Sequence, residues 1–280
     1  MSASSRAVSI TRVAGGGRTD ADDRVAAEEP LEIQVVASKP DAAAAKSLSI
    51  TMRTPGQDED LAVGFLFTEG IITSADQVVR IDRVGQPDAA SGEQNTVRVL
   101  LRDDVDVALD KLTRHFYTTS SCGVCGKASL DALHVAGQAS LADVGTRFDA
   151  AVLSGLPDRV RERQRVFGET GGLHAAAVFN PDGDIVVVKE DVGRHNATDK
   201  AIGALLVAGR LPGHEFGLLV SGRASFELMQ KTLVAGIPLL AAVGAPSSLA
   251  VQTAETFGMT LVGFLRDGGF NIYAGKTRIG

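Results

Sequence analysis

The first half of the chain contains four strand-like runs, and in the first of them the apolar residues Leu31, Ile33 and Val35 alternate with polar ones. The runs cover residues 31–35, 47–54, 78–84 and 96–101. A period of two residues predicts strands with one buried face and one face toward solvent. With a helix between the second and third runs, they predict a small α+β unit in the first 115 residues.

The segment TPGQDEDLAVGFLFTEG, residues 54–70, predicts that helix. Carboxylates at Asp58, Glu59 and Asp60 suit the positive end of a helix that begins there. Gly70 suits its end, because glycine readily adopts the left-handed conformation that closes a helix.

The second half of the chain predicts a different architecture. Residues 173–191 indicate a β hairpin that turns at Asp182 and Gly183, and a helix follows over residues 196–208. From residue 215 onward, apolar strands alternate with helices. This alternation predicts an α/β fold with a parallel-containing sheet and helices on both of its faces.

Serines and glycines mark the ends of the last two predicted helices. Ser225 and Ser248 are placed to cap the first turns, and Gly236 and Gly258 are placed to end the helices. These signals fix where the last three strands begin and end.

The composition divides the chain into four parts. Residues 1–27 are rich in Ser, Ala, Gly, Arg and Asp, which predicts a mobile tail. The small α+β unit occupies residues 28–114, and a mobile cysteine loop with a short helix occupies residues 115–137. The α/β core occupies residues 138–280.

The overall charge and hydropathy argue against some classes of function. A net charge of -6 and a pI near 5.4 are untypical of a nucleic-acid-binding protein. No apolar run reaches the roughly 18–20 residues that cross a bilayer, and the N-terminus lacks the pattern of a signal peptide. We therefore expect a cytoplasmic protein, whose thiols stay reduced.

Three loops would leave the same edge of the predicted sheet if its last strands are parallel neighbours. Residues 221–225 and 244–248 are small-residue loops that open into helices, and residues 266–269 follow the last strand. Free N–H groups at helix starts favour a phosphate, and Arg223 and Arg266 could add charge-assisted hydrogen bonds. Together the loops predict a nucleotide or phosphate site, although the third could instead be a simple hairpin turn.

The only two cysteines, Cys122 and Cys125, form a Cys-x-x-Cys motif in a polar segment with glycines on both sides. A predicted helix start after Cys125, with Lys127 close by, would lower a thiol pKa and make the thiolate available. Such a thiolate suits carriage of sulfur as a persulfide. The first cysteine would carry the sulfur, and the second would assist transfer or attack the persulfide.

Other interpretations of the pair have weaker support. A structural zinc site needs four ligands, and His115 and His134 lie seven and nine residues from the cysteines, a spacing that no common zinc motif has. A thioredoxin-like redox pair normally joins a strand to a helix in a βαβ unit, whereas this segment is polar and rich in glycine. Two ordinary buried cysteines are disfavoured by the polar neighbours.

Two further groups of residues could carry chemistry. His174 lies in a predicted strand, but Ala176 stands where a zinc-dependent deaminase has glutamate, and the cysteines precede the histidine. The charged run 189–199 is first interpreted as a solvated strand–helix junction. A ligand-facing role for Arg194 or His195 is the alternative.

Long motifs connect the chain to one known family. They are EEPLEI, MRTPGQDEDLAVGFLFTEGII, FYTTSSCGVCGK, TGGLHAAAVF, EDVGRHNATDKAIG, SGRASFELMQK, AGIP, APSSLAV and TLVGFLR. Through these motifs the chain resembles the formate dehydrogenase accessory sulfurtransferase family from Glu28 to Tyr273. Only the N-terminal tail lies outside the resemblance.

The resemblance implies a cytoplasmic sulfurtransferase with a core similar to the cytidine deaminase fold. A cysteine desulfurase would load sulfur onto Cys122. The sulfur would then pass to the bis-molybdopterin guanine dinucleotide form of the molybdenum cofactor, before its insertion into formate dehydrogenase. The resemblance also implies a homodimer.

The same resemblance places the cofactor on a segment near the C-terminus. The matching residues are Phe264, Leu265, Arg266, Asp267, Gly268 and Gly269, to which the loop analysis adds Arg223. Two rival functions stay open: a chaperone that binds the cofactor without chemistry, and a dithiol redox protein that cycles a Cys122–Cys125 disulfide.

Overall fold

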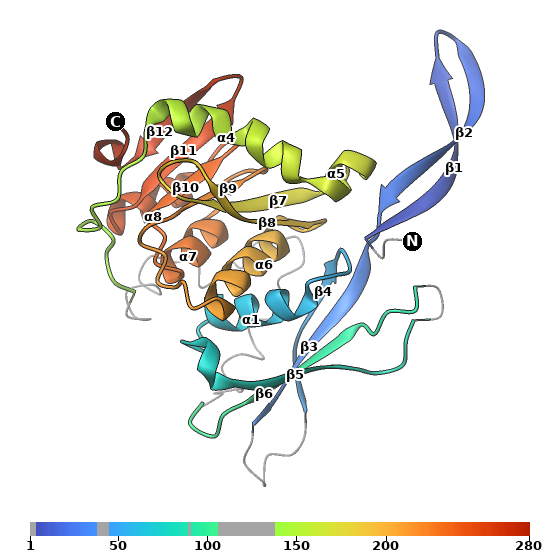
Figure 1. Cartoon of the computed structure of the whole chain (residues 1–280), viewed down its shortest axis with the longest axis horizontal. Coiled ribbons are helices and arrows are strands. Elements are labelled where there is room, and N and C mark those ends of the chain that lie inside the picture. Colours follow the sequence, from blue (N-terminus) through green and yellow to red (C-terminus); the bar gives the residue numbers. More distant parts are fainter. Residues whose placement is uncertain (1–3, 38–44, 89–90, 106–137) are drawn as a thin grey trace.

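The computed structural model describes residues 4–37, 45–88, 91–105 and 138–280. Its described strands form three sheets, with strand orders β1-β2, β4-β3-β6-β5 and β12-β11-β10-β9-β7-β8. In Figure 1 the six-stranded sheet and its helices lie above the four-stranded sheet, with α1 between the two. The cysteine segment 115–137 lies outside the described residues, so its predicted structure is untested.

The first part of the chain supplies two of the sheets and one α-helix. The elements are β1 (Ser5–Ala14), β2 (Gly17–Ala26), β3 (Glu29–Ala37), β4 (Lys46–Arg53), α1 (Asp58–Thr68), the short 3-10 helix η2 (Ala75–Gln77), β5 (Val78–Val84) and β6 (Thr96–Leu101). The four predicted strands and the predicted helix are confirmed. In β3 and β6 every second residue is buried, as a period of two residues predicts.

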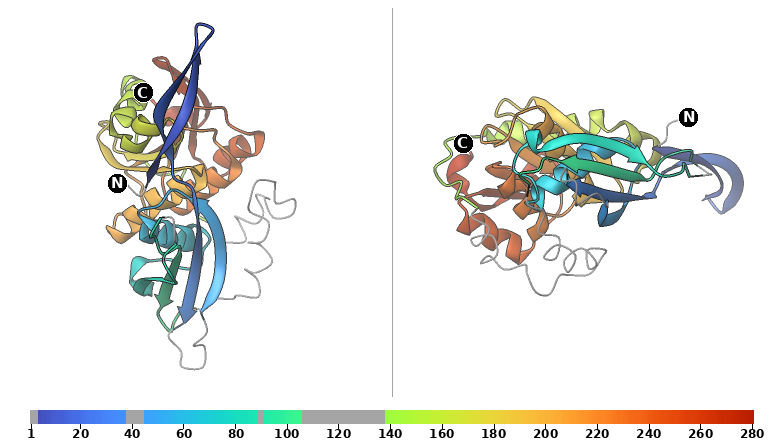
Figure 2. Two further views of the ribbon diagram at one scale, coloured as in Figure 1. Left: turned by 90° about the vertical axis from the view of Figure 1, so that its right-hand side faces the viewer. Right: turned by 90° about the horizontal axis from the view of Figure 1, so that it is seen from below.

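The N-terminal segment contradicts the prediction of a mobile tail. Strands β1 and β2 pair antiparallel over their whole lengths and stand out from the body of the molecule (Figures 1 and 2). Cross-strand hydrogen bonds join Ser9 to Asp22 and Thr11 to Asp20. The polar composition concealed the strands, since these side chains pair across the hairpin and need no core.

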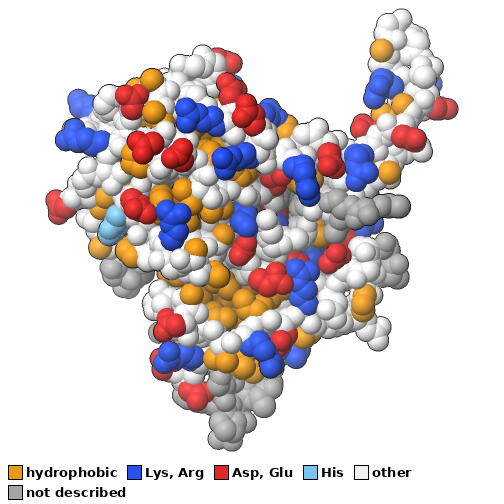
Figure 3. All heavy atoms as spheres, viewed as in Figure 1, with side chains coloured by type: hydrophobic (Ala, Val, Ile, Leu, Met, Phe, Trp, Pro, Cys, Tyr) orange, Lys and Arg blue, Asp and Glu red, His pale blue; other side chains and the backbone are white. Residues whose placement is uncertain are grey.

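The base of this hairpin is fixed to the body by charged contacts. Arg24 forms an ion pair with Glu169 (3.4 Å), and Ser5 donates a hydrogen bond to the same carboxylate. Arg6 pairs with Glu29 at the start of the next sheet. In the space-filling view, charged side chains of both signs lie along the projecting hairpin (Figure 3).

The last part of the chain forms the six-stranded sheet and its helices. The elements are α4 (Ala150–Arg163), α5 (Arg165–Thr170), β7 (His174–Phe179), β8 (Ile185–Asp191), α6 (Arg194–Val207), β9 (Gly217–Val220), α7 (Phe226–Val234), β10 (Leu239–Ala242), α8 (Ser248–Thr256), β11 (Thr260–Arg266), β12 (Gly269–Ala274) and the 3-10 helix η3 (Lys276–Arg278). Strands β9, β10 and β11 are parallel neighbours, as predicted, whereas β7, β8 and β12 run antiparallel to their partners.

Helices cover both faces of this sheet, which confirms the α/β prediction. On one face, α4 contributes Leu153, Leu156 and Val160 to a buried cluster. The sheet contributes residues such as Ala177 of β7 and Leu219 of β9 to the same cluster. On the other face, α6, α7 and α8 cover a larger buried cluster that continues through α1 into the four-stranded sheet. The two sheets therefore share one hydrophobic core.

Helices α1 and α6 touch backbone to backbone where two glycines meet. A Cβ atom on Gly64 would overlap the carbonyl oxygen of Asp199, and one on Gly203 would overlap that of Asp60. Only glycine allows the helices to approach this closely. The contact places the N-terminal unit directly on the helix layer of the α/β core.

Two buried ion pairs flank the glycine contact. Lys231 of α7 lies 2.9 Å from Asp199 of α6 and donates a hydrogen bond to Thr68 of α1. Lys200 lies 2.7 Å from Asp191, and both side chains are almost completely buried. Buried charges are tolerated only when they are paired and hydrogen-bonded, so these pairs require one arrangement of the helices.

The glycines at the helix ends match the sequence signals, and the two predicted serine caps need correction. Gly236 and Gly258 have positive φ angles of 68° and 64°, as expected of residues that end helices. The cap of α8 is Ser247, whose hydroxyl accepts a hydrogen bond from the Ala250 N–H, and not Ser248. Ser225 occupies the N-cap position of α7, but its side chain makes no capping hydrogen bond.

Replacing Gly64 by alanine should destabilise the protein by roughly 1–3 kcal/mol or more, because the added methyl group overlaps backbone that cannot move independently. Chemical denaturation of the variant measures the loss. Gly155→Ala in α4 is the matched control: its Cβ would enter open space, so it should be neutral or slightly stabilising. Equal stability of the two variants would contradict the glycine contact.

Candidate functional site

The three loops singled out from the sequence do converge at the carboxyl edge of β9, β10 and β11. The Gly244 N–H donates to the Gly222 carbonyl (2.9 Å), and the Phe264 N–H donates to the Gly244 carbonyl (3.1 Å). Ala224 and Pro246 form a further bridge between the first two loops. Parallel strand order makes this possible, because it brings the carboxyl ends of all three strands to one edge.

Strand β11 is distorted where it reaches this edge. Phe264 has a φ angle of 53°, and the register with β12 shifts between Gly263 and Arg266. A Cβ on Gly263 would lie 2.9 Å from both Pro246 Cδ and Tyr273 Cε2, so the neighbouring loop packs directly on the strand. A bulge of this kind redirects a side chain, and strained backbone is frequent at binding sites.

The predicted cofactor residues fall into different environments. The Phe264 ring is partly exposed, and the Arg266 guanidinium lies 5.6 Å from its centroid. The Leu265 side chain is completely buried in the cluster beneath α4, so only its backbone can face a ligand. Arg223 is exposed at the end of β9.

The remaining cofactor residues form the tip of a β hairpin. Asp267 and Gly268 have φ angles of 53° and 74° and connect Arg266 to its cross-strand partner Gly269. All four are exposed. The loop is therefore a hairpin turn, as the alternative interpretation of the sequence held. Strand β11, which leads into it, still borders the other two loops.

A second group of polar side chains lies at the same edge, around the start of α6. Arg194 and His195 are the first two residues of that helix, and Glu227 lies in the first turn of α7. His174 begins β7, which pairs antiparallel with β9 and so starts where β9 ends. We call these four residues the edge cluster. The sequence offered Arg194 and His195 only as an alternative interpretation, since nothing in the linear pattern places them beside His174.

The backbone of Gly222 lies against this cluster. A Cβ on Gly222 would lie 3.4 Å from His174 Nδ1 and 3.7 Å from Arg194 Cδ. Beside it, the Ser221 hydroxyl accepts a hydrogen bond from the Ala175 N–H, and the Ser221 N–H donates one to the Ala175 carbonyl. The loop after β9 is thus shared between the edge cluster and the converging loops.

Asp191 organises the turn that precedes α6. One carboxylate oxygen accepts hydrogen bonds from the Gly193 N–H (2.9 Å) and the Asn196 side chain (3.0 Å). The other accepts from the Thr54 N–H and lies 2.7 Å from Lys200 Nζ. The N-terminal unit, through Thr54, thereby helps to fix the first turn of α6.

The edge cluster contains polar atoms that the protein leaves unsatisfied. Arg194 Nε and His195 Nε2 are buried, and neither has a hydrogen-bond partner in the described part of the chain. Burial, together with the positive charges of Arg194 and Lys231, lowers the pKa of His195 to about 4. Burial and Arg194 also lower the pKa of His174.

Glu227 carries the one carboxylate of the edge cluster. Burial would raise its pKa, but the hydrogen bond from its own backbone N–H, together with His195 and Arg194, lowers the pKa below its usual value. Glu227 therefore stays ionised beside a histidine that stays neutral. The two residues do not form an ion pair.

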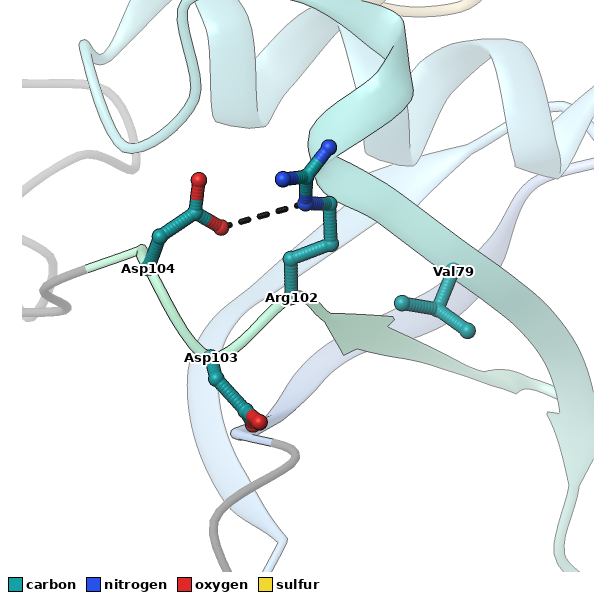
Figure 4. Close-up of a pocket in the computed structure, with 4 residues that line it drawn as sticks. All are labelled: Val79, Arg102, Asp103 and Asp104. Atoms are coloured by element: carbon teal, nitrogen blue, oxygen red, sulfur yellow. Dashed lines mark ion pairs between the residues drawn. The ribbon is translucent and has the colours of Figure 1, made fainter.

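Other parts of the described structure offer weaker sites. A surface hollow is lined by Val79, Arg102, Asp103 and Asp104, and its arginine pairs with Asp104 (3.2 Å; Figure 4). The same arginine also pairs with Asp76 (3.3 Å). Within residues 4–37, 45–88, 91–105 and 138–280, no three His, Cys, Asp or Glu side chains are placed to bind a metal ion. In the same ranges no helix is long and apolar enough to cross a membrane. Cys122 and Cys125 lie outside them.

The FdhD/NarQ family model matches residues 26–280 of this chain. The chain belongs to the FdhD/NarQ family. Curated relatives named sulfur carrier protein FdhD include those of Streptomyces avermitilis (49% identical; 96% of this chain and 94% of the relative) and Saccharolobus solfataricus (40%; 92% and 91%). A crystal structure from Desulfotalea psychrophila, described as a candidate formate dehydrogenase accessory protein, superposes with a TM-score of 0.74 at 25% identity and covers 99% of both chains.

Membership of the FdhD/NarQ family confirms the resemblance drawn from the sequence motifs. The family model begins at residue 26, so the hairpin of β1 and β2 lies almost entirely outside it. The converging loops and the edge cluster all lie inside the matched range.

The stability of the protein should depend on His195 below neutral pH. Because its folded pKa of about 4 lies below the unfolded value of 6.5, the unfolded chain binds the proton first as the pH falls. Between pH 6.5 and pH 4, the free energy of unfolding of the wild type should fall by on the order of 3 kcal/mol more than that of His195→Gln. Denaturation across this pH range tests the difference, with exposed His214→Gln as the control. Identical pH profiles for wild type and His195→Gln would disprove the shift.

Proposed function

We propose that this chain is a sulfur carrier that accepts sulfur from a cysteine desulfurase. It would deliver that sulfur to the bis-molybdopterin guanine dinucleotide form of the molybdenum cofactor, before the cofactor enters formate dehydrogenase. The observation that carries the proposal is family membership over residues 26–280, with relatives named sulfur carriers at 40–49% identity. Both cysteines of the motif are present in this sequence.

The proposed sulfur transfer is a thiol–persulfide exchange. The Cys122 thiolate attacks the outer sulfur of a persulfide on the desulfurase, and a new S–S bond forms at Cys122. The S–S bond of the desulfurase breaks, and its cysteine leaves as a thiolate. No oxidant is consumed, because the sulfur keeps its oxidation state as it moves.

The proposed cofactor site is the carboxyl edge of β9, β10 and β11. The partly exposed Phe264 ring, with Arg266 beside it, offers a stacking surface for a guanine base. Arg223, Asp267, Gly268 and Gly269 are exposed around that surface and supply charge and backbone groups. We propose that the protein acts in the cytoplasm as a homodimer.

Loading with a cysteine desulfurase and L-cysteine should add the mass of a sulfur atom to the protein, and Cys122→Ala should abolish the gain. Intact-protein mass spectrometry, before and after reduction, measures it. Cys125→Ala is the matched variant: it should still load if the second cysteine only assists. An unchanged wild-type mass would exclude the persulfide, and normal formate dehydrogenase maturation by a Cys122→Ser, Cys125→Ser variant would favour a non-catalytic chaperone instead.

Arg266→Ala should weaken binding of guanosine diphosphate about tenfold or more, because a charge-assisted hydrogen bond contributes roughly 1.5–3 kcal/mol. Calorimetric titration measures the affinity. Lys276→Ala removes an exposed positive charge outside the proposed site and should leave the affinity unchanged. Equal losses in both variants would show that net charge, and not a contact at Arg266, controls binding.

A further inference from the structure

The hairpin of β1 and β2 carries aliphatic side chains on one of its two faces. In the register of the strands, Ile10 lies opposite Ala21, and Val8 and Val25 point to the same side. We call these four residues the apolar face of the hairpin. Within residues 4–37, 45–88, 91–105 and 138–280, neither hydrophobic cluster includes any of them. The apolar face is therefore not part of the core.

The opposite face of the hairpin is polar, and it is the face that contacts the body. Ser5 and Arg24 both contact Glu169 of α5, and farther out Ser9 donates a hydrogen bond to Asp22. The apolar face is consequently turned away from α5. An isolated two-stranded hairpin is at best marginally stable in water, so burial of its apolar face would add stability.

A second uncovered apolar surface lies on the four-stranded sheet. Strands β3 and β4 pair so that Ile50 lies opposite Glu32 and Met52 lies opposite Pro30. Ile50 is 70% exposed and Met52 is 47% exposed, whereas Leu31, on the other face of the sheet, is buried in the core. We call Pro30, Ile50 and Met52 the outer patch. Neighbouring exposed apolar side chains of this kind mark interaction surfaces.

The apolar face and the outer patch are directed apart within one molecule. In Figures 1 and 2 the hairpin projects away from the four-stranded sheet. Its strands have 10 residues each, which gives a reach of roughly 30 Å beyond the body. One chain thus supplies both halves of an apolar contact that it cannot close by itself. A second copy related by a two-fold axis closes the contact twice, once on each side of the axis.

Unpaired charges of opposite sign lie beside the two surfaces. Arg12 follows Ile10 on the same face of the hairpin, toward its tip, and is exposed. Among the described residues Arg12 has no ion pair, unlike Arg6 nearer the body. Glu32, beside Ile50, accepts a hydrogen bond from Gln34 (2.9 Å) and likewise has no ion pair in the described part of the chain. Complementary charges of this kind favour one partner and one register.

We propose that the apolar face of the hairpin docks on the outer patch of a second copy of this chain, with Arg12 beside Glu32 of the partner subunit. The inference rests on the homodimer proposed above and names its interface. Each copy gives its hairpin and receives the hairpin of the other. The contact therefore buries both apolar surfaces of both copies.

Ile10→Asp and Ile50→Asp should each weaken the dimer about tenfold or more, because each places a carboxylate in both apolar contacts. Analytical ultracentrifugation measures the dissociation constant. Val13→Asp is the matched control: Val13 is 66% exposed on the opposite face of the hairpin, so the dimer should be unchanged. Unchanged dimers of Ile10→Asp and Ile50→Asp, or a monomeric wild type, would overturn the interface.

A charge exchange keeps the test decisive if these variants fold poorly. Arg12→Glu and Glu32→Arg should each weaken self-association, because both contacts of the dimer then carry like charges. When the two variants are co-expressed, both contacts of the mixed dimer carry opposite charges again. Native mass spectrometry should therefore find mixed dimers in clear excess over both parent dimers. Random mixing of the two variants would contradict the contact.

Sulfur loading of the wild type separates this inference from the proposed sulfur transfer. A gain of sulfur mass on a protein that stays monomeric would support the carrier and overturn the interface. A dimer that responds to the variants as expected, but gains no sulfur mass, would support the interface and refute the carrier.

Discussion

The contact between α1 and α6 is the constraint on which the rest of the structure depends. Gly64 and Gly203 let the two helices meet at backbone distance, and a methyl group on either would overlap a carbonyl oxygen of the other helix. Because α1 belongs to the four-stranded sheet and α6 to the six-stranded sheet, this contact joins their cores into one. Beside it, the buried Lys231–Asp199 pair joins α7 to α6, and Lys231 also donates a hydrogen bond to Thr68 of α1.

The same constraint reaches the candidate site. Helix α6 starts at the carboxyl edge of the sheet, and its first turn is tied to the N-terminal unit through Asp191 and Thr54. Polar groups deeper along α6 are paired, as at Asp199 and Lys200, whereas buried atoms of Arg194 and His195 are not. The paired groups of α6 thus lie in the core, while its first turn lies partly buried at the sheet edge.

Local patterns predicted most of the elements. The alternating runs, the acidic helix start at Asp58 and the strand–helix alternation after residue 215 all match the structure, since each signal reflects which face is buried. The hairpin of β1 and β2 was missed because it is stabilised by cross-strand polar pairs. No helix was predicted over residues 150–163, where Pro157 and many charged residues weaken the helical signal.

The sequence by itself determined the family, the strand–helix alternation after residue 215 and the three loops at the sheet edge, because motifs and burial periods are properties of neighbouring residues. Only the tertiary structure decided that Leu265 is core, that Asp267 and Gly268 form a hairpin tip, and that His174 joins Arg194 and His195. The physical reason is that antiparallel pairing of β7 with β9, and the close approach of two helices, bring together residues far apart in the chain. No local pattern records such distances.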